Sequence, residues 1–554
     1  MSRAHKRPRA RPYAASAQKE AFQMDNLFDK RMSRRSFMGM AAGALAACGL
    51  AQLGISASDA RFAYAADGGK TFTYAIAGDP SVSPNVITTS DRFGLMTLKL
   101  VYSPLWMCNA DGINYFLAES YEESEDHLTL TVHLREGVKW NDGEPFTADD
   151  VVFTYEAVEA DETANQFTQL DYGDQGQVKV EKVDDLTVNF TFPFLNAAAP
   201  EMLSQFFIAP KHLYEGVTDW ENNDVNTKGV GTGPYKLEEY QVGQYLRFSA
   251  NPDYFLGAPK VDTVVFQIIT NENTGMQAIQ AGEVNAWIGT PAQVEQMNID
   301  GNGLVVTPYS EGRVAYMMFN CNRVKDENVR KAFLYSLDKN SIALAALLKE
   351  DYFDLVHTFL PPTSEFYAGD QVEQYNQDVE KAKQMLADAG QPNPSFTLAY
   401  AASDTLQQTC AVMMQEQAAA AGITLTLQGV DANALAQSMQ DPNNQYDMYF
   451  GGYIMGIDPS TFESLFQNGG AWNYMFYDYP KIDELFDAGA VETDKDKRKE
   501  EYTELQKTIQ DTAAFYPMYS NKRLLVTTKN VTNIEEAKLV PVYTFEDLSK
   551  IDMQ

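Results

Sequence analysis

LREGVKWNDGEPFTADDV, residues 134–151, is the most informative stretch of this sequence. It follows residues 128–134, in which apolar and polar side chains alternate as in a half-buried strand. Residues 141–143 (Asn-Asp-Gly) are turn formers. Thr147, with Asp150 three residues later, has the spacing of a helix capping box. The stretch therefore predicts a strand, a turn and the start of a helix, and its expected role is architectural.

Strand-like and helix-like segments alternate on both sides of this stretch. Residues 187–192 alternate like a half-buried strand, and residues 264–269 form an apolar run typical of a strand buried on both faces. Helical patterns follow near residues 327–337, 379–389, 404–421 and 494–510, two of them stopped by Gly390 and Gly422. At 554 residues the chain is too long for one core, so mixed α/β structure in more than one lobe is expected.

Composition excludes several classes of partner. Lys and Arg number 43 against 76 Asp and Glu, a net charge of −33, which disfavours nucleic acid and anionic membrane surfaces. The four cysteines lie far apart and form no CxxC pair, which argues against a zinc ribbon or a disulfide framework: Cys48, Cys108, Cys321 and Cys410.

Motifs for catalysis are missing from the sequence. It has no Walker loop, no HExxH and no GxSxG. Residues 229–234 (GVGTGP) superficially resemble a phosphate-binding loop, but Pro234 replaces the third glycine and a strand-like segment follows. A structural turn is the better interpretation. We expect no enzyme activity, no metal site and no cofactor.

The first 65 residues predict an export signal. Residues 33–38 (SRRSFM) resemble the twin-arginine motif, and residues 37–58 carry no charge. The sequence offers two alternative positions at which this signal ends. Residues 45–48 (LAAC) resemble a lipobox, in which Cys48 would be acylated, whereas residues 63–65 (AYA) resemble a cleavage site after Ala65.

The start of translation is also open, because Met24 or Met32 would serve as well as Met1. Residues 1–65 carry 11 basic and 4 acidic side chains, so their removal changes the net charge from −33 to −40. The mature protein is therefore expected to be strongly acidic and extracytoplasmic, in the periplasm or on the outer face of the cell membrane.

Residues 134–151 closely resemble the signature of the family 5 extracellular solute-binding proteins, which are the oligopeptide- and dipeptide-binding components of ABC importers. The resemblance covers nearly all of residues 70–554. Four other segments resemble segments of the same family in the same order: residues 231–237 (GTGPYKL), 278–286 (AIQAGEVNA), 328–339 (NVRKAFLYSLDK) and 516–519 (YPMY).

The resemblance implies a two-lobed α/β periplasmic-binding-protein (Venus flytrap) fold with an extra inserted domain. Domain I would combine residues 67–105, 186–308 and 522–554, domain II would be residues 106–185, and domain III residues 309–521. The implied partners are a small peptide or related solute and the transmembrane subunits of an ABC permease. The protein is expected to be a monomer that touches the membrane only through an anchor at Cys48.

The resemblance also implies a ligand anchor. Peptide binders of this family hold the ligand's amino terminus with an Asp shortly after a Gly-Trp pair. In this sequence Tyr453 stands at the Trp position and Gly456 at the Asp position. Asp458 belongs to an Asp-Pro turn, and whether it substitutes for the missing Asp is open.

Ten residues are the predicted ligand contacts, and for each aromatic among them packing in the core is an equal alternative: Val82, Ser83, Tyr453, Ile454, Met455, Asp458, Trp472, Asn473, Tyr474 and Tyr519. The function that this resemblance implies is a peptide receptor. The alternatives are the same scaffold binding a metal chelate, haem, an opine or an oligosaccharide, and, from another class, a secreted hydrolase.

Overall fold

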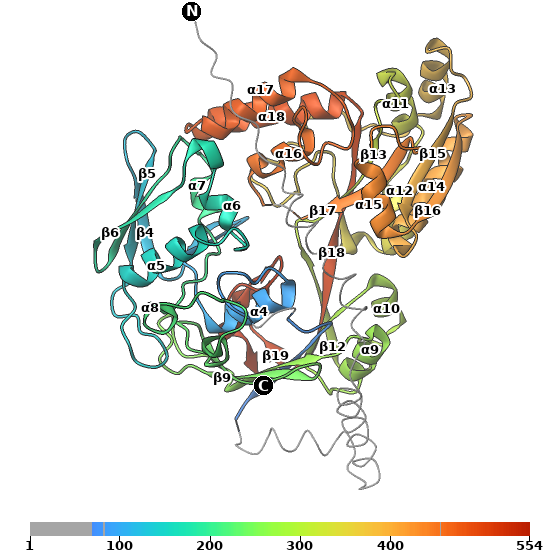
Figure 1. The fold of residues 1–554 in the computed structure, drawn as a ribbon. Coiled ribbons are helices and arrows are strands. Elements are labelled where there is room, and N and C mark those ends of the chain that lie inside the picture. The colour runs from blue at the N-terminus through green and yellow to red at the C-terminus, as the bar shows by residue number, and fades with distance from the viewer. Residues whose placement is uncertain (1–68, 81–83, 455) are drawn as a thin grey trace, which may run out of the picture.

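The computed structural model describes residues 69–80, 84–454 and 456–554, and its main element is a twelve-stranded sheet (Figure 1). The strand order is β16-β15-β17-β13-β18-β11-β1-β10-β9-β8, and β12 and β14 both pair with β18. These strands are β1 (Thr71–Ile76), β8 (Tyr235–Gln241), β9 (Tyr245–Ala250), β10 (Thr263–Ile268), β11 (Ala286–Gly289), β12 (Leu304–Ser310), β13 (Val314–Phe319), β14 (Phe353–Leu355), β15 (Ser395–Ala401), β16 (Thr424–Val430), β17 (Met448–Tyr453) and β18 (Phe515–Thr528).

Strand β18 joins two halves of this sheet. Its first part pairs with β13 and β14, and its second part pairs with β11 and β12. At about 3.4 Å per residue, its 14 residues are long enough to cross both halves. We call the half built on β1 and β8–β12 the first lobe and the half built on β13–β17 the second lobe.

The first lobe has three neighbouring parallel strands at its centre, β11, β1 and β10. β10, the strand expected at residues 264–269, lies between β1 and β9. Five helices are associated with this part of the chain: α4 (Arg92–Val101), α7 (Ala199–Met202), α8 (Lys211–Tyr214), α9 (Glu272–Gln280) and α10 (Pro291–Gln296). The remaining short elements are η2 (Asp224–Thr227), β19 (Val531–Thr532), α19 (Ile534–Ala537), β20 (Leu539–Val540), β21 (Thr544–Phe545), η5 (Leu548–Lys550) and β22 (Asp552–Met553).

A separate four-stranded antiparallel sheet lies beside the first lobe (Figure 1). Its order is β4-β5-β7-β6. Its strands and near neighbours are β2 (Trp106–Asn109), β3 (Gly112–Tyr115), β4 (Ala118–Glu123), β5 (Thr129–Leu134), α5 (Ala148–Glu159), α6 (Phe167–Leu170), η1 (Gly173–Gln175), β6 (Lys179–Asp184) and β7 (Thr187–Thr191).

The stretch at residues 134–151 links this sheet to α5 as its sequence predicts. The Thr147 side chain accepts a hydrogen bond from the Asp149 amide, and the Asp150 carboxylate accepts the Thr147 amide at 2.9 Å, which completes the capping box. Trp140 is fully buried, and its indole donates to Asp150 at 3.4 Å. These contacts lie within the protein and agree with an architectural role.

Helices surround the sheet of the second lobe. They are α11 (Glu327–Tyr335), α12 (Lys339–Leu347), η3 (Glu350–Tyr352), α13 (Val379–Asp388), α14 (Thr405–Ala420), α15 (Ala432–Met439), η4 (Pro459–Phe462), α16 (Glu463–Phe466), α17 (Pro480–Val491) and α18 (Lys495–Asp511). The four predicted helices correspond to α11, α13, α14 and α18. Gly390 and Gly422 follow two of them with φ of +70° and +82°, a conformation that glycine adopts without strain.

Residues 229–234 form a structural turn, as interpreted from the sequence. β8 follows them directly where a phosphate-binding loop would lead into a helix. A Cβ atom on Gly231 would lie 1.8 Å from the Val101 carbonyl oxygen. The glycine is therefore needed for close packing against the end of α4.

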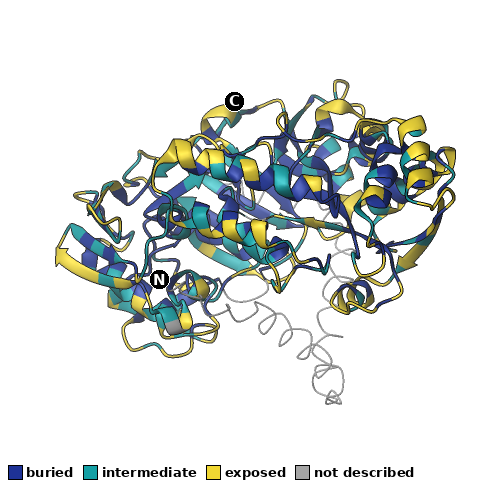
Figure 2. Cartoon of the chain, turned by 90° about the horizontal axis from the view of Figure 1, so that it is seen from above, coloured by how far each residue is buried: buried dark blue, intermediate teal, exposed yellow. Residues whose placement is uncertain are grey.

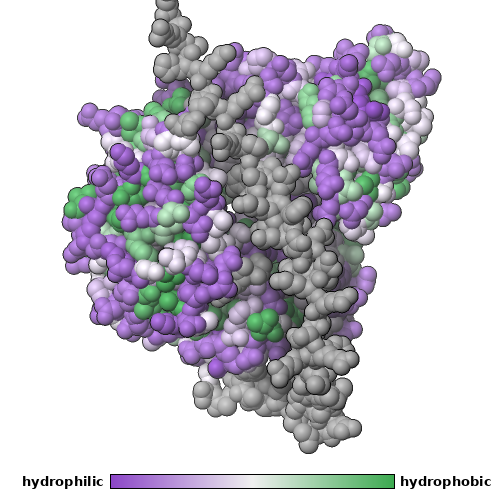
Figure 3. Space-filling model, in the orientation of Figure 1, coloured by the Kyte–Doolittle hydropathy of each residue, from purple (hydrophilic) through white to green (hydrophobic). Residues whose placement is uncertain are grey.

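Burial follows the sheet and the inner faces of the helices, while the outer helix faces are exposed (Figure 2). The face in Figure 3 is mainly hydrophilic with small, separate hydrophobic spots. Among the described residues, no helix is both long and apolar enough to cross a membrane.

The structure leaves two predictions untested, the export signal and the domain limits. The export signal at residues 1–65, including Cys48, lies outside the described residues. The domain limits remain a prediction; β7 pairs with strands expected in domain II, although its residues were assigned to domain I.

Candidate functional site

The two lobes are connected by two neighbouring crossings. One is residues 311–313 between β12 and β13, and the other is the middle of β18. Gly312 has a φ of +68°, which lets the chain turn between the two strands. The buried Glu311 carboxylate forms ion pairs with Arg92 of α4 at 2.6 Å and with Arg523 of β18 at 3.4 Å. Glu311 lies in the first crossing and Arg523 in the second, so these ion pairs connect both crossings to α4 of the first lobe.

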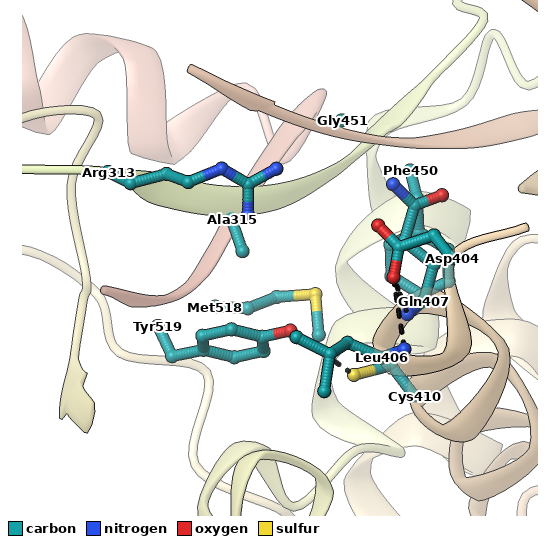
Figure 4. A pocket seen from close by; sticks show the side chains of 10 residues that line it. All are labelled: Arg313, Ala315, Asp404, Leu406, Gln407, Cys410, Phe450, Gly451, Met518 and Tyr519. Atoms are coloured by element: carbon teal, nitrogen blue, oxygen red, sulfur yellow. Dashed lines mark hydrogen bonds between the residues drawn. The ribbon is translucent and has the colours of Figure 1, made fainter. Parts of the chain in front are cut away.

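A pocket opens beside this crossing on the second lobe (Figure 4). The empty space in it is about 280 Å³ when open solvent is counted, but its interior has room for only about one water molecule. It is lined by Arg313 of the crossing, Ala315 (β13), Phe450 and Gly451 (β17), Met518 and Tyr519 (β18), and Asp404, Leu406, Gln407 and Cys410 (at α14).

Arg313 is the cationic side chain of this pocket, and it extends across the wall above Tyr519 (Figure 4). Its Nη1 donates to Asn521 Oδ1 at 3.5 Å. A Cβ on Gly452 would lie 2.5 Å from Nη2, so glycine makes room for the guanidinium. Among the described residues, no carboxylate lies within 4.0 Å of this guanidinium. Arg313 is thus free to pair with an anionic group that enters the pocket.

Tyr519 lines the same pocket but is nearly buried. Its hydroxyl lies 3.7 Å from the Cys410 sulfur, and burial raises the pKa of Tyr519 well above its ordinary value. The ring therefore offers a neutral apolar surface to the pocket, and ligand contact by Tyr519 stays a prediction.

Tyr453 is held by contacts inside the second lobe. Its hydroxyl donates to the Phe359 carbonyl at 2.5 Å, and its ring lies 5.2 Å from the rings of Tyr316 and Phe462. These contacts fit the packing alternative. Ile454, the next residue, is 40% exposed beyond the end of β17.

Asp458 is buried in an ion pair. Both of its carboxylate oxygens accept hydrogen bonds from the Arg498 guanidinium, at 2.7 and 2.9 Å. One of these oxygens also accepts a hydrogen bond from the Ser460 amide and so caps the start of η4. The lone pairs that would meet a ligand amine are therefore largely committed to the protein.

The three residues at 472–474 differ in exposure. Trp472 is 42% exposed, with its ring 6.3 Å from that of Tyr474. Asn473 is buried and donates to the Gln467 carbonyl at 3.0 Å. Trp472 can thus offer an aromatic surface to solvent, whereas Asn473 supports its own loop.

The other predicted contacts cannot be placed. Val82, Ser83 and Met455 lie outside the described residues. Before them in the chain, the Asp79 carboxylate accepts hydrogen bonds from the Tyr240 hydroxyl at 3.0 Å and the Gly243 amide at 2.8 Å.

Glu201 was missed by the sequence analysis. It projects from α7 and accepts the amides of Ile457 at 2.9 Å and Asp458 at 3.4 Å, which lie in the opposite lobe. Burial, and then the Asp458 carboxylate, raise the pKa of Glu201 to about 7. No local pattern marks this residue, because its partners are 256 and 257 positions away.

Within the described residues, no group of three or more His, Cys, Asp and Glu side chains is placed to hold a metal ion. The described residues thus provide two separate features: a pocket beside the crossing with the Arg313 guanidinium in its wall, and a contact in which the Glu201 carboxylate joins α7 to the loop after β17. The pocket can receive a small anionic group.

Residues 112–474 match the model of the bacterial extracellular solute-binding proteins, family 5. The chain belongs to this family. It is 29% identical to the oligopeptide-binding protein AppA of Bacillus subtilis over 81% of this chain and 86% of that protein. The resemblance found in the sequence is therefore confirmed.

Solved structures show the same fold. The substrate-binding protein CtaP of Listeria monocytogenes superposes with a TM-score of 0.82 at 35% identity, over 88% of this chain and 99% of that one. AppA of Bacillus subtilis, solved with a nonapeptide, superposes with a TM-score of 0.66 at 26% identity, over 88% and 99%. The two-lobed solute-binding fold expected from the sequence is confirmed.

Proposed function

We propose that this family 5 protein is an extracytoplasmic receptor that binds peptides between its lobes and delivers them to the transmembrane subunits of an ABC permease. Similarity to an oligopeptide-binding protein over most of the chain supports this solute class. Catalysis is no part of the mechanism.

The observation that carries the proposal is the pocket wall at Arg313. A guanidinium without a carboxylate partner among the described residues faces a pocket beside the hinge. Arg pairs with carboxylates through two parallel hydrogen bonds, and every unmodified peptide has a terminal carboxylate.

Binding would act through closure of the lobes. A solute that contacts both lobes stabilises the closed form by the difference in its affinity for the closed and open forms. A difference of about 5.5 kcal/mol is enough to move a two-state equilibrium from 1:99 to 99:1. A permease that recognises the closed form would then receive loaded receptors.

The proposal also covers where in the cell the protein acts. The protein would reach the outside of the cytoplasmic membrane as a monomer, with domains I to III as predicted, and be retained by acylation of Cys48 rather than released by cleavage after Ala65. Cys48→Ala should then move the protein from the membrane fraction to the soluble fraction. An unchanged distribution of the variant and the wild type would contradict the anchor.

Native mass spectrometry of the protein purified gently from its own cells tests the solute. A ladder of bound short peptides is the expected result. A single non-peptide mass, such as a metal chelate, haem, an opine or an oligosaccharide, would overturn the peptide assignment. Turnover of a co-purified compound would instead support a hydrolase.

A further inference from the structure

A second pocket opens where the two lobes meet, and it shares no residue with the pocket beside the crossing. Its volume is about 310 Å³. A cavity of about 150 Å³ already holds a benzene ring, so a large apolar side chain fits in this one. We call it the junction pocket, and its lining comes from the edge of the four-stranded sheet and from the end of α17: Gln175, Pro193, Phe194, Leu195 and Val491.

The walls of the junction pocket belong to different lobes. The Ala197 amide, two residues after Leu195, donates to the carbonyl of Ala490, the neighbour of Val491, at 3.0 Å. Figure 1 shows the end of α17 beside α7 at this place. Separation of the lobes here would move Val491 away from Leu195. The pocket is therefore complete only while the lobes are in contact.

The lining is apolar and lies at the surface. Val491 is 39% exposed, and Phe194 and Leu195 are partly exposed. The ring of Phe194 is held by an edge-on contact with that of Tyr172 at 4.8 Å, so this wall is fixed. Apolar side chains gathered around a surface depression are typical of a place where another molecule binds.

The rim of the junction pocket is acidic on the side of the four-stranded sheet. Asp171 forms a β-bridge with Gln177 across the turn that contains Gln175. Burial, and then the Glu156 and Asp171 carboxylates, raise the pKa of Glu159 to about 7. Glu159 Oε1 is buried and has no hydrogen-bond partner among the described residues. Negative charge on this side is therefore unbalanced.

The rim is acidic on the side of the second lobe as well. Glu492 follows Val491 directly, and burial, and then Glu492, raise the pKa of Glu501 in α18, although Arg498 and Lys497 oppose the shift. Within the part of the chain that the structure describes, no Lys, Arg or His forms an ion pair within 4.0 Å with any of the four rim carboxylates, Glu159, Asp171, Glu492 and Glu501. Such a rim attracts a cationic partner.

We propose that the junction pocket is the surface by which the permease recognises the closed receptor, and that it takes an apolar side chain flanked by Lys or Arg on an extracytoplasmic segment of the transmembrane subunits. The inference rests on the proposed function and adds the surface and the chemistry of the partner. A segment that contacts both walls binds the closed form more tightly than the open form, without touching the solute. A second copy of this chain fits poorly, because its net charge of −33 would face the acidic rim.

Photocrosslinking in the producing cells identifies the occupant. A photoreactive phenylalanine analogue is placed at Lys495, an exposed residue three positions after Glu492, and in a second strain at Val412, an exposed residue of α14. We expect a crosslink from position 495 to a transmembrane subunit of an ABC permease, and none to that subunit from position 412. A crosslink from position 495 to a second copy of this chain, or to no permease subunit, would overturn the proposal.

Uptake of a radiolabelled short peptide that the wild type binds tests the role of the pocket. Val491→Asp places a charge in the apolar lining and should lower uptake by about tenfold or more. Its affinity for the peptide by calorimetry, and its compaction with peptide by small-angle scattering, should equal those of the wild type. Val412→Asp is the matched control, since Val412 is 49% exposed outside the pocket, and its uptake should hardly change.

Glu492→Lys tests the rim and leaves the apolar lining intact. Reversal of this charge should lower uptake by about threefold or more, because charges at a rim act mainly on the rate of association. This variant also decides the matter if Val491→Asp fails to fold or to close. Full uptake by the variants would overturn the docking surface and leave the peptide receptor intact, whereas a wild type that binds no peptide would overturn both.

Discussion

At the scale of the residue, the side chains that matter most in this protein are defined by distant partners. The sequence places Asp458 in an Asp-Pro turn, and the structure pairs it with Arg498, 40 residues later. The ring of Tyr453 packs against those of Tyr316 and Phe462, and its contact with ligand stays a prediction. Glu201 is one of 76 acidic residues and has no distinguishing neighbours in the sequence.

Arg313 should contribute to recognition of carboxylates. Arg313→Gln is expected to weaken binding of peptides with a free terminal carboxylate by about tenfold or more, because it removes a charge-assisted hydrogen bond. The same peptides amidated at that end are the control, and their affinity should hardly change. Calorimetry measures both, and equal losses for the two sets would contradict this role.

Arg498 should contribute to stability. Arg498→Met leaves the Asp458 carboxylate buried without its partner, which is expected to lower the free energy of unfolding by about 3–5 kcal/mol. Urea unfolding measures the change. Lys481→Met is the control, since Lys481 is an exposed partner of Glu484 at 3.9 Å and should change stability by less than about 0.5 kcal/mol. Similar stabilities of the two variants would show that the buried pair is not needed.

At the scale of the element, local patterns predicted much of the structure. The capping box at Thr147, the glycine stops after α13 and α14, and the buried strand β10 all depend on residues within a few positions of one another. The pairing of β18 with strands of both lobes joins residues up to 241 positions apart, Ala286 and Thr527, and no local period encodes it. The family resemblance, rather than the pattern, supplied the two-lobed arrangement.

The turn at residues 229–234 gives a test at this scale. Gly231→Ala would place a methyl group 1.8 Å from the Val101 carbonyl, so α4 or the turn has to move. We expect a loss of about 1–3 kcal/mol in the free energy of unfolding, typical of overpacking. Gly243→Ala is a useful comparison, because no atom lies within 4 Å of its added methyl group, although its φ of +74° adds some strain. If Gly231→Ala is the more stable of the two, close packing is not the reason for the glycine.

At the scale of the whole molecule, closure should depend on pH through Glu201. Burial, and then the Asp458 carboxylate, raise the pKa of Glu201 from an ordinary 4.5 to about 7, so a form that makes this contact between the lobes binds a proton more tightly than a form that lacks it. Lowering the pH through this interval therefore favours closure, and raising it above about 7 removes the effect. The groups that face Glu201 are Asp458, its partner Arg498 and the Cys108 thiol, whose pKa near 12 keeps it neutral throughout.

Small-angle scattering of the unliganded protein measures this closure. The radius of gyration should be smaller at about pH 5.5 than at about pH 8, and peptide should reduce it at both. Glu201→Gln should lose the pH dependence and keep the response to peptide. A wild-type radius that is the same at both pH values would refute the linkage, and one that ignores bound peptide would refute the hinge.

The single strand shared by both lobes also has a consequence for biosynthesis. β18 is the fourteen-residue segment that completes both halves of the large sheet, yet the ribosome makes it after every other strand of that sheet. Until residue 528 has emerged, β12 and β13 have no partner in β18, and unpaired strand edges invite association with other chains. The nascent chain therefore needs protection for almost the whole of its translation, and an export route for folded proteins can accept it only after synthesis has ended.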